Sequence, residues 1–376
     1  MAEHFVESVE VAAVSAHAAA WRDLCGRALE ANAFAEPAFL IAAARHIAPP
    51  GVEFILVWAD ERRQKLVGLL AISSLRLGVA EIWQSEQAGL AAIALDREAA
   101  AETFDSVAQW LRDKRRAAAL LAPTLASDGK TARLLAEFVH RLGSTFVSLH
   151  PRQRAILSAA RDERARFEAA LNGKRLKEWR RLRRRLAERG VLAFRAAECP
   201  AALAATSEAF LALEPKSWKG RGGAPLVADP ARAAFAREML KSFASENKLR
   251  VCALELADAP IAMGVVLSSQ GRAFYWKTAY DEAFAEFSPG VLLTLDLSRV
   301  QEADPKVEAT DSCAIEDHPM IDRLWPGRLA LEDRLVPLGS GADWRVKLWL
   351  AKREQTRLLK EIAKRALFPL LGRKRS

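Results

Sequence analysis

The sequence predicts a mixed α/β fold in two tandem halves, each a mostly antiparallel sheet flanked by helices. Helical patterns and short apolar runs alternate along the 376 residues, a length that suits two domains. The order of two helices, an antiparallel hairpin and further helix–strand units occurs twice. In addition, VWADERRQKLVGLLAIS and LELADAPIAMGVVLSSQ share a pattern of strand, acidic turn and apolar strand with an early glycine. These observations predict a duplicated architecture.

The first half is predicted to span residues 1–160. Apolar residues every three or four positions indicate helices, and short apolar runs bounded by polar turns indicate strands. The predicted elements are helices over 16–30 and from Pro37, strands 53–59 and 66–73 joined by a turn, a helix over 98–115, a strand at 117–121, a helix over 130–142 and a strand at 145–149. The order predicts helices layered on a mixed sheet.

The second half is predicted to span residues 161–335. The predicted elements are helices over 201–214 and 230–246, a strand at 250–256, hairpin strands at 261–267 and 273–278, a helix over 290–302 and a strand at 307–311. Asp229 and Pro230 suit the N-cap and first position of the second of these helices. The polar Ser268–Gly271 link between two apolar runs is typical of a hairpin.

The stretch Ser288-Pro289-Gly290 lies between a predicted strand and a helix. Proline is preorganised for the first turn of a helix. A helix that begins just beyond a strand offers unpaired N–H groups and the positive end of its dipole to a phosphate. We therefore expect this helix start to hold the pyrophosphate of an acyl carrier such as coenzyme A. The expected cofactor-binding residues are Lys277, Ser288, Gly290, Val291 and Leu292.

Composition limits the classes of protein to which the chain can belong. Hydrophobic residues make up 51% of the sequence, but no apolar run reaches the ~18–20 residues that span a bilayer. The N-terminal MAEHFVESVE lacks the basic region of a secretory signal. Four widely separated cysteines, Cys25, Cys199, Cys252 and Cys313, have no metal-like spacing. We expect reduced thiols, no bound metal and a cytoplasmic location.

The net charge of +9 favours an anionic partner, and two segments contain much of it. Residues 174–189 hold nine Lys and Arg together with an apolar stripe. They are either a contact surface for phosphates, RNA or lipid, or a solvated helix packed on the second half. The segment 336–376 is a basic amphipathic tail. It could lie on the inner face of an anionic membrane, or dock on the body with a frayed end.

A loop rich in cations and glycine follows the helix over 201–214. Trp218, Lys219 and Arg221, with three glycines nearby, suit a polar or anionic ligand, because glycines let backbone N–H groups approach it. The alternative is a flexible surface loop. We expect these residues, together with Tyr275 on the hairpin, to bind the acceptor substrate, either a small molecule or a saccharide.

Several of these pieces occur together in one known family. They are KRLKEWRRLRRRLAERG, FLALEPKSWKGRGG, LRVCALELADAPIAMGVVL, FYWKTAYDEAFAEFSPGVLL and the acidic Asp311 at the end of the next strand. From Leu171 to about Arg328 the chain resembles the CelD-like (cellulose biosynthesis protein) acetyltransferase family of the GNAT superfamily, whose relatives include the FemAB peptidyltransferases. The first half is similar to the N-terminal GNAT-like half that such proteins often have.

The resemblance implies tandem GNAT-like domains and acyl transfer from acetyl-CoA or another acyl-CoA to an amine or hydroxyl, in polysaccharide or cell-envelope biosynthesis. The phosphate loop departs from the usual Gln/Arg-x-x-Gly-x-Gly/Ala pattern, since the chain has Glu286 and a single glycine, Gly290. Two alternatives follow. One is a FemAB-like transferase that uses aminoacyl-tRNA, the only case in which nucleic acid is expected as a partner. The other is a catalytically inactive GNAT-fold binding protein.

Four residues are candidates for the proton transfers that acyl transfer needs. Asp311, Asp317 and His318 cluster after the last core strand, and any of the three could act as the base. The unperturbed pKa of histidine, about 6.5, suits this role. The resemblance implies that Tyr280 protonates the leaving thiolate. The alternatives are a structural cap for Asp311, a turn for His318 and packing for the tyrosine.

Overall fold

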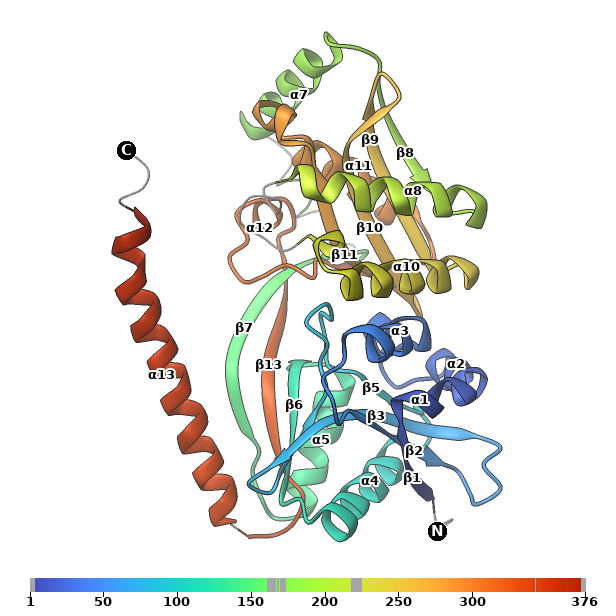
Figure 1. Ribbon diagram of the computed structural model, residues 1–376, viewed down its shortest axis with the longest axis vertical. Coiled ribbons are helices and arrows are strands. Elements are labelled where there is room, and N and C mark those ends of the chain that lie inside the picture. Colours follow the sequence, from blue (N-terminus) through green and yellow to red (C-terminus); the bar gives the residue numbers. More distant parts are fainter. Residues whose placement is uncertain are drawn as a thin grey trace.

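One sheet extends through the whole molecule (Figure 1). The structure is a computed structural model that describes residues 4–160, 167, 169, 174–217, 225–341 and 343–372. Its strands are β1 (Phe5–Glu10), β2 (Glu53–Trp58), β3 (Leu66–Arg76), β4 (Val79–Ile82), β5 (Ile93–Leu95), β6 (Ala119–Ala126), β7 (Val147–Ser158), β8 (Leu192–Ala197), β9 (Leu249–Leu256), β10 (Ala259–Ser269), β11 (Arg272–Tyr280), β12 (Ala309–Asp311) and β13 (Gly327–Pro337).

The strand order confirms the predicted fold class. Across the sheet the order is β1-β2-β3-β4-β6-β13-β7-β12-β11-β10-β9-β8, with β5 paired to β3 off this path. The pairs β4–β6 and β11–β12 are parallel, and the other pairs of the sheet are antiparallel. In the first half the antiparallel strands β1 to β4 are followed by β6, which is parallel to β4. In the second half the antiparallel strands β8 to β11 are followed by β12, which is parallel to β11. The fold is therefore a duplicated, mostly antiparallel sheet flanked by helices.

The two halves exchange their last long strands at the centre of the sheet. β13 comes from the second half but pairs with β6 of the first half, and β7 of the first half pairs with β12 of the second. β7 and β13 also pair with each other from Val147 to Ile156. The predicted boundary at 160/161 thus separates segments of one continuous sheet, because each half is completed by a strand from the other.

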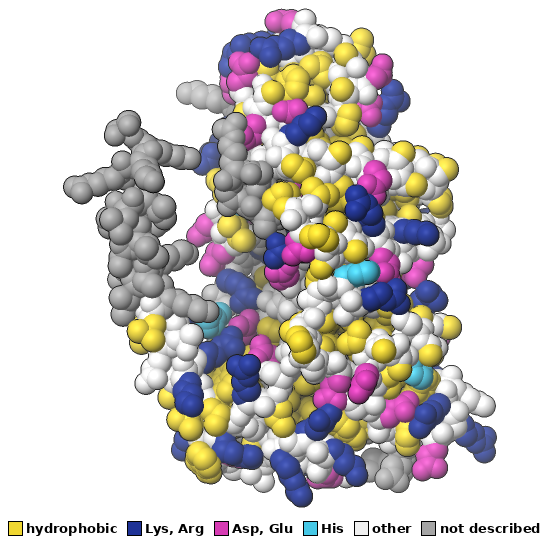
Figure 2. Space-filling view, in the orientation of Figure 1, with side chains coloured by type: hydrophobic (Ala, Val, Ile, Leu, Met, Phe, Trp, Pro, Cys, Tyr) yellow, Lys and Arg dark blue, Asp and Glu magenta, His cyan; other side chains and the backbone are white. Residues whose placement is uncertain are grey.

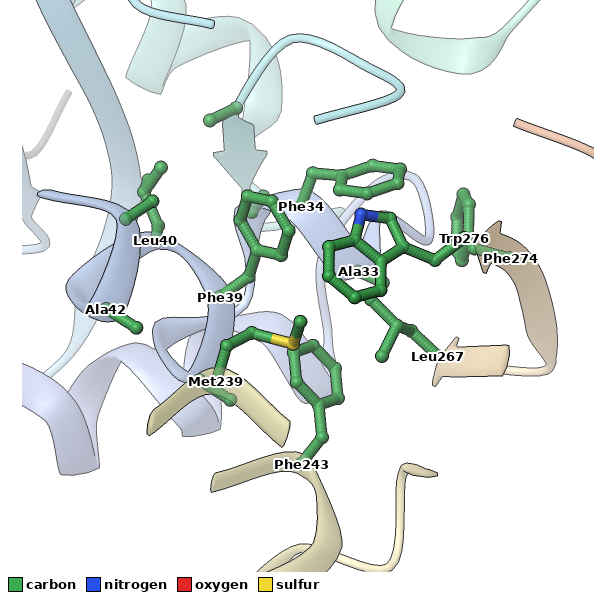
Figure 3. Close-up of a cluster of buried hydrophobic side chains, with 14 of the residues drawn as sticks. Ala33, Phe34, Phe39, Leu40, Ala42, Met239, Phe243, Leu267, Phe274 and Trp276 are labelled. Atoms are coloured by element: carbon green, nitrogen blue, oxygen red, sulfur yellow. The ribbon is translucent and has the colours of Figure 1, made fainter. Parts of the chain in front are cut away.

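Four helices from both halves cover one face of this sheet. They are α2 (Ala18–Gly26), α3 (Pro37–Ile47), α8 (Pro200–Leu213) and α10 (Pro230–Ser245). Phe39 of α3 meets Phe235 of α10 with ring centroids 5.4 Å apart, and Phe34 meets Phe274 of β11 at 5.3 Å. Figure 3 shows Phe34, Phe39 and Trp276 within this shared core. Such apolar burial joins the halves into one unit.

A buried carboxylate strengthens the same junction. Glu36, at the start of α3, is 1% exposed. It receives the ammonium of Lys248 at 2.9 Å and the hydroxyl of Ser269 at 2.6 Å, both from the second half. Burial alone would lower the pKa of Lys248, but the carboxylates of Glu36 and Glu246 together outweigh it, so this pKa is raised. A buried charge with these partners avoids the cost of an unpaired one.

The opposite face of the sheet has a separate group of helices for each half. α4 (Ala100–Arg115) and α5 (Lys130–Arg141) cover the first half, and α7 (Lys174–Ala187), α11 (Pro289–Ala303) and α12 (Ile321–Leu324) cover the second. The apolar stripe of the basic α7 packs inward as expected, with Leu182 7% and Leu186 0% exposed. The last helix, α13 (Trp344–Gly372), lies beside the central strands (Figure 1).

The predicted elements are present, but their bounds and number differ from the expectation. The strand expected at 145–149 extends to Ser158 as β7, and β1, β4, β5, β8 and β13 were not predicted. None of the described helices is long and apolar enough to cross a membrane. Of the four thiols, those of Cys25 and Cys252 are buried and that of Cys199 is exposed. Burial raises the pKa of Cys252 to about 12, so this thiol is inert.

Candidate active site

β11 and β12 are neighbours in the sheet over only three residues. The parallel pairing joins Arg272–Phe274 to Ala309–Asp311, whereas β11 continues alongside β10 to Tyr280. The register between β10 and β11 shifts at Trp276, which is left out of the pairing. A bulge of this kind bends a strand and changes the direction of its side chains. The second part of β11 therefore separates from β12 and approaches the start of α11.

The start of α11 has the geometry expected from Ser288-Pro289-Gly290. Ser288 is the N-cap in the left-handed region, with φ of 52°, and Pro289 is the first helical residue. The carbonyl of Ser288 accepts hydrogen bonds from the amides of Val291 at 3.0 Å and Leu292 at 3.2 Å. These two amides are therefore used within the first turn. Anion binding here would depend on the Gly290 amide, which has no partner among the described residues, and on the helix dipole.

Three segments meet at Gly290. A Cβ added to this glycine would lie 3.5 Å from Cδ1 of Tyr280 and 3.8 Å from Sδ of Met320. Tyr280 is the last residue of β11, and Met320 belongs to the loop between β12 and α12. Sequence reasoning did not include Met320, since nothing in its local pattern marks it. The structure thus brings Tyr280, Gly290 and the loop that contains His318 together.

The basic helix α7 lies beside this helix start. The guanidinium carbons of Arg185 and Arg189 lie 5.5 and 4.5 Å from the ring centroid of Phe287. Arg189 pairs with Glu286 at 2.9 Å, and Arg185 lies 3.8 Å from the same carboxylate. Arg185 lies in the last turn of α7, and Arg189 lies in the turn that follows Ala187. Two cations therefore adjoin the predicted phosphate site.

Tyr275 supports the helix start from within the core. Its side chain is 4% exposed, and its hydroxyl lies 3.3 Å from Oγ1 of Thr294. Thr294 in turn donates to the carbonyl of Gly290 at 2.7 Å. Burial raises the pKa of Tyr275 to about 12, so this phenol stays protonated. The predicted role in substrate binding is untested, and the observed contacts favour a positioning role.

The other predicted ligand contacts are only partly within the described chain. Lys277 is half-buried on β11, with its ammonium 5.2 Å from the ring centroid of Trp276. Trp218, Lys219 and Arg221 lie outside the described residues. Their assignment to the acceptor remains a prediction from the sequence.

Asp311 is fully buried in an ion pair that links three parts of the molecule. Its oxygens lie 2.6 and 2.5 Å from Nε and Nη2 of Arg154 on β7, and one of them accepts the amide of Cys313 at 2.9 Å. Arg154 also donates to the carbonyl of Gly89 at 2.9 Å. Burial alone would lower the pKa of Arg154, but Asp311 outweighs it and raises this pKa. These contacts favour a structural role for Asp311 over the predicted role as a base.

His318 shapes the loop that brings Met320 to the helix start. Its Nδ1 accepts the amides of Met320 at 3.3 Å and Ile321 at 3.4 Å, and thereby caps α12. These bonds assign the proton of the neutral ring to Nε2. His318 thus has a structural contact at one nitrogen, and the predicted role in proton transfer would involve the other.

A polar cavity lies where the loop after β12 meets the exchanged strands. Its volume is 320 Å³. Among its lining residues are Arg152, Glu316, Asp317, Asp322 and Arg328. Asp322 contributes a buried Oδ1 that has no hydrogen-bond partner among the described residues. Sequence reasoning considered only Asp317 here, because the lining residues come from segments far apart in the chain.

A known protein family matches the part of the chain that contains this helix start. Residues 173–309 match the family model for the acetyltransferase (GNAT) domain. The match covers a little over one third of the chain and includes α7, β11, α11 and therefore Tyr280 and Gly290. It ends before Asp311 and His318. It supports an acyltransferase domain of the GNAT type, and the narrower CelD-like assignment stays a prediction.

Solved structures share the GNAT-like fold over nearly the whole chain. The C-terminal DUF2156 domain of a candidate lysylphosphatidylglycerol synthetase from Agrobacterium fabrum aligns with TM-score 0.53 and 12% identity, over 90% of this chain and 96% of that one. FemX aligns with TM-score 0.50 and 9% identity, over 89% and 96%. A conserved protein of unknown function from Bacteroides thetaiotaomicron VPI-5482 aligns with TM-score 0.50 and 9% identity, over 88% of this chain and 99% of that one. No curated protein matches this chain.

Proposed function

We propose that this chain is an acyltransferase that moves an acetyl or other acyl group from acyl-CoA to an amine or hydroxyl acceptor. The observation that carries the proposal is the meeting of Tyr280, Gly290 and Met320 at the start of α11. Tyr280 and Gly290 lie within the span that matches the acetyltransferase (GNAT) domain. Coenzyme A would enter as a co-substrate, with its phosphates near the Gly290 amide, Arg185 and Arg189.

Acyl transfer needs different roles from the residues around the start of α11. The acceptor must lose a proton as it attacks the thioester carbonyl, and the leaving thiolate must gain one. Tyr280 lies beside the helix start and would supply the proton to the thiolate. Nε2 of His318 would exchange a proton with the acceptor, whereas Asp311 would hold the strands in place through Arg154.

The polar cavity is our candidate for the acceptor site. Glu316, Asp317 and Asp322 would bind an ammonium group, and Arg152 with Arg328 would bind a carboxylate or phosphate of the same molecule. The Agrobacterium fabrum protein with this fold is described as a candidate lysylphosphatidylglycerol synthetase. That description supports an acceptor from lipid or cell-envelope chemistry, either an amine or a hydroxyl.

A matched pair of variants tests the proposal, because the chain contains only two tyrosines. Tyr280→Phe keeps the ring beside Gly290 but removes the hydroxyl. We expect kcat to fall about 100-fold with acetyl-CoA and an amine panel, with little change in KM for the donor. Tyr275→Phe removes the buried hydroxyl bonded to Thr294, and should cost about 1 kcal/mol of stability while kcat stays near wild type.

Free coenzyme A released per turnover is the measurement, followed with a thiol reagent. If acetyl-CoA neither raises the melting temperature nor supports turnover with any amine or hydroxyl acceptor, the acyl-CoA assignment is wrong. The chain would then fit the catalytically inactive binding protein. Equal kcat for both tyrosine variants would instead remove Tyr280 from the mechanism and leave the activity in place.

An aminoacyl-tRNA donor is the second candidate, and one observation favours it. Lys177, Arg180 and Arg184 line a groove of 690 Å³ on α7 and have no ion-pair partner among the described residues. Figure 2 shows Lys and Arg side chains gathered over this end of the molecule. Salt-sensitive tRNA binding that the double variant R180Q/R184Q weakens, together with no response to acetyl-CoA, would favour this donor.

A further inference from the structure

The last helix and the residues after it have the same net charge as the whole chain. Residues 344–376 contain 11 Lys and Arg and two Asp and Glu, against 56 and 47 in the whole sequence. The preceding 343 residues therefore contain 45 of each sign, and the excess of +9 belongs to residues 344–376. Charge concentrated in one terminal helix indicates a local partner for that helix.

One face of α13 docks on the body. Val346, Trp349 and Leu350 pack against a small cluster that includes Val79 and Leu335. Further along the same face, Arg353 pairs with the buried Asp333 at 2.7 Å. These contacts fix the first turns of the helix beside the central strands, as Figure 1 shows. The docked face thus accounts for only part of the apolar residues on α13.

A second apolar stripe lies on the opposite face of α13. Its large members are exposed to solvent: Trp344 by 69%, Leu348 by 38%, Leu358 by 46% and Leu359 by 66%. Leu348 is two residues beyond the docked Val346, which is about 200° around a helix of 3.6 residues per turn. The stripe includes four of the eight exposed large hydrophobic side chains found among the described residues.

Cations border this stripe on both sides. Lys347 and Lys352 are both exposed. Around the helix axis, Lys347 lies about 60° from Trp344 on one edge of the apolar face, and Lys352 lies about 40° from Leu348 on the other edge. The sequence continues beyond Leu359 with three more cations in the helix, and Arg373-Lys374-Arg375 follow it. An apolar stripe flanked by Lys on a helix of strong positive charge is the pattern of a helix that lies in a membrane interface.

We propose that the outer face of α13 binds the surface of an anionic lipid bilayer. The apolar side chains would enter the boundary between headgroups and acyl chains, while the flanking lysines would contact the headgroups. Each cation near such a surface adds to the attraction. The cations and Trp344 would also suit a nucleic acid, but its phosphate backbone and bases offer no apolar environment to the exposed Leu348, Leu358 and Leu359. The apolar stripe therefore decides for the membrane.

Vesicle binding by the full-length chain tests this proposal without reference to its enzymatic activity. We expect the chain to float with vesicles of phosphatidylcholine containing 30% phosphatidylglycerol, and about tenfold less with phosphatidylcholine alone. L358S/L359S should weaken binding to the anionic vesicles at least tenfold, and K347Q/K352Q several-fold. Leu75→Ser changes an equally exposed leucine on β3, 44% exposed, and should bind like the wild type.

None of these variants touches the docked face, so their melting temperatures should match that of the wild type. Absence of binding to anionic vesicles would overturn the proposal, as would equal binding by wild type and L358S/L359S. Binding to tRNA or duplex DNA that K347Q/K352Q weakens and L358S/L359S leaves unchanged would assign the helix to a nucleic acid instead.

Discussion

Asp311→Asn is expected to lower the free energy of unfolding by about 3–5 kcal/mol, since it leaves the buried Arg154 without a charge partner. The guanidinium is 4% exposed, and its two bonds to Asp311 hold β7 against β12. Solvent cannot replace the lost partner at such a site. Urea unfolding at pH 7, followed by tryptophan fluorescence, measures the change.

A surface pair provides the control. Arg237 and Glu208 form an ion pair of 2.8 Å, but both side chains are about half exposed. Glu208→Gln should therefore cost no more than about 1 kcal/mol. The experiment also separates the two roles considered for Asp311. A variant that loses turnover while its stability stays near wild type would contradict the structural role and restore the predicted base.

The elements that the sequence predicts well are those whose pattern is local. The hairpin of β10 and β11 has two apolar runs and a Gly-containing link, and its register pairs Ser269 with Arg272 across that link. The start of α11 depends on three consecutive residues, Ser288-Pro289-Gly290, whose preferences for that position are intrinsic. Both could be placed correctly because no distant part of the chain is needed to form them.

The exchanged strands show why the remainder could not be predicted. β13 contains Glu332, Asp333 and Arg334 in succession, a charged run that lacks the apolar pattern of a buried strand. All three are at least 92% buried, because β6, β7 and α13 supply partners such as Thr124, whose amide donates to Asp333 at 3.0 Å. The partner on α13, Arg353, lies 20 residues from Asp333. However, Thr124 on β6 lies 209 residues from Asp333, and Ser148 on β7 lies 184 residues from Glu332. The strand exchange between halves follows from such contacts, which no local window contains.

In the candidate site too, contacts between residues close in sequence could be predicted, and contacts between distant residues could not. Tyr280 and Gly290 lie ten residues apart on neighbouring elements, and their meeting follows from the order of strand and helix. Arg154 and Asp311 are 157 residues apart, so the ion pair that occupies the carboxylate of Asp311 could not be predicted from the sequence. The basic helix α7 could be predicted only in part. Its composition is evident from the sequence, but its position beside Phe287 is not.

Gly264→Ala is the second substitution with a large expected effect. A Cβ at this position on β10 would lie 2.7 Å from Cε2 and 3.0 Å from the hydroxyl oxygen of Tyr275. The ring cannot move away freely, because it is buried against α11 and hydrogen-bonded to Thr294. We expect a loss of about 1–3 kcal/mol in the free energy of unfolding. Displacement of Tyr275 should also disturb the bond from Thr294 to Gly290, and so weaken donor binding.

Gly26→Ala is the matched control, because a Cβ at Gly26 meets no atom within 4 Å. That variant should be as stable as the wild type or slightly more stable, since alanine favours the helix. Isothermal titration with acetyl-CoA should show weaker binding for Gly264→Ala alone. If Gly264→Ala destabilises the chain but binds the donor normally, Tyr275 is only a core residue. The early glycine of the first repeat, Gly68, has a different nearest neighbour, because a Cβ there would lie closest to Cγ2 of Thr103 on α4 rather than to a side chain of the adjacent strand; in both halves, however, a side chain occupies the space that a Cβ would need.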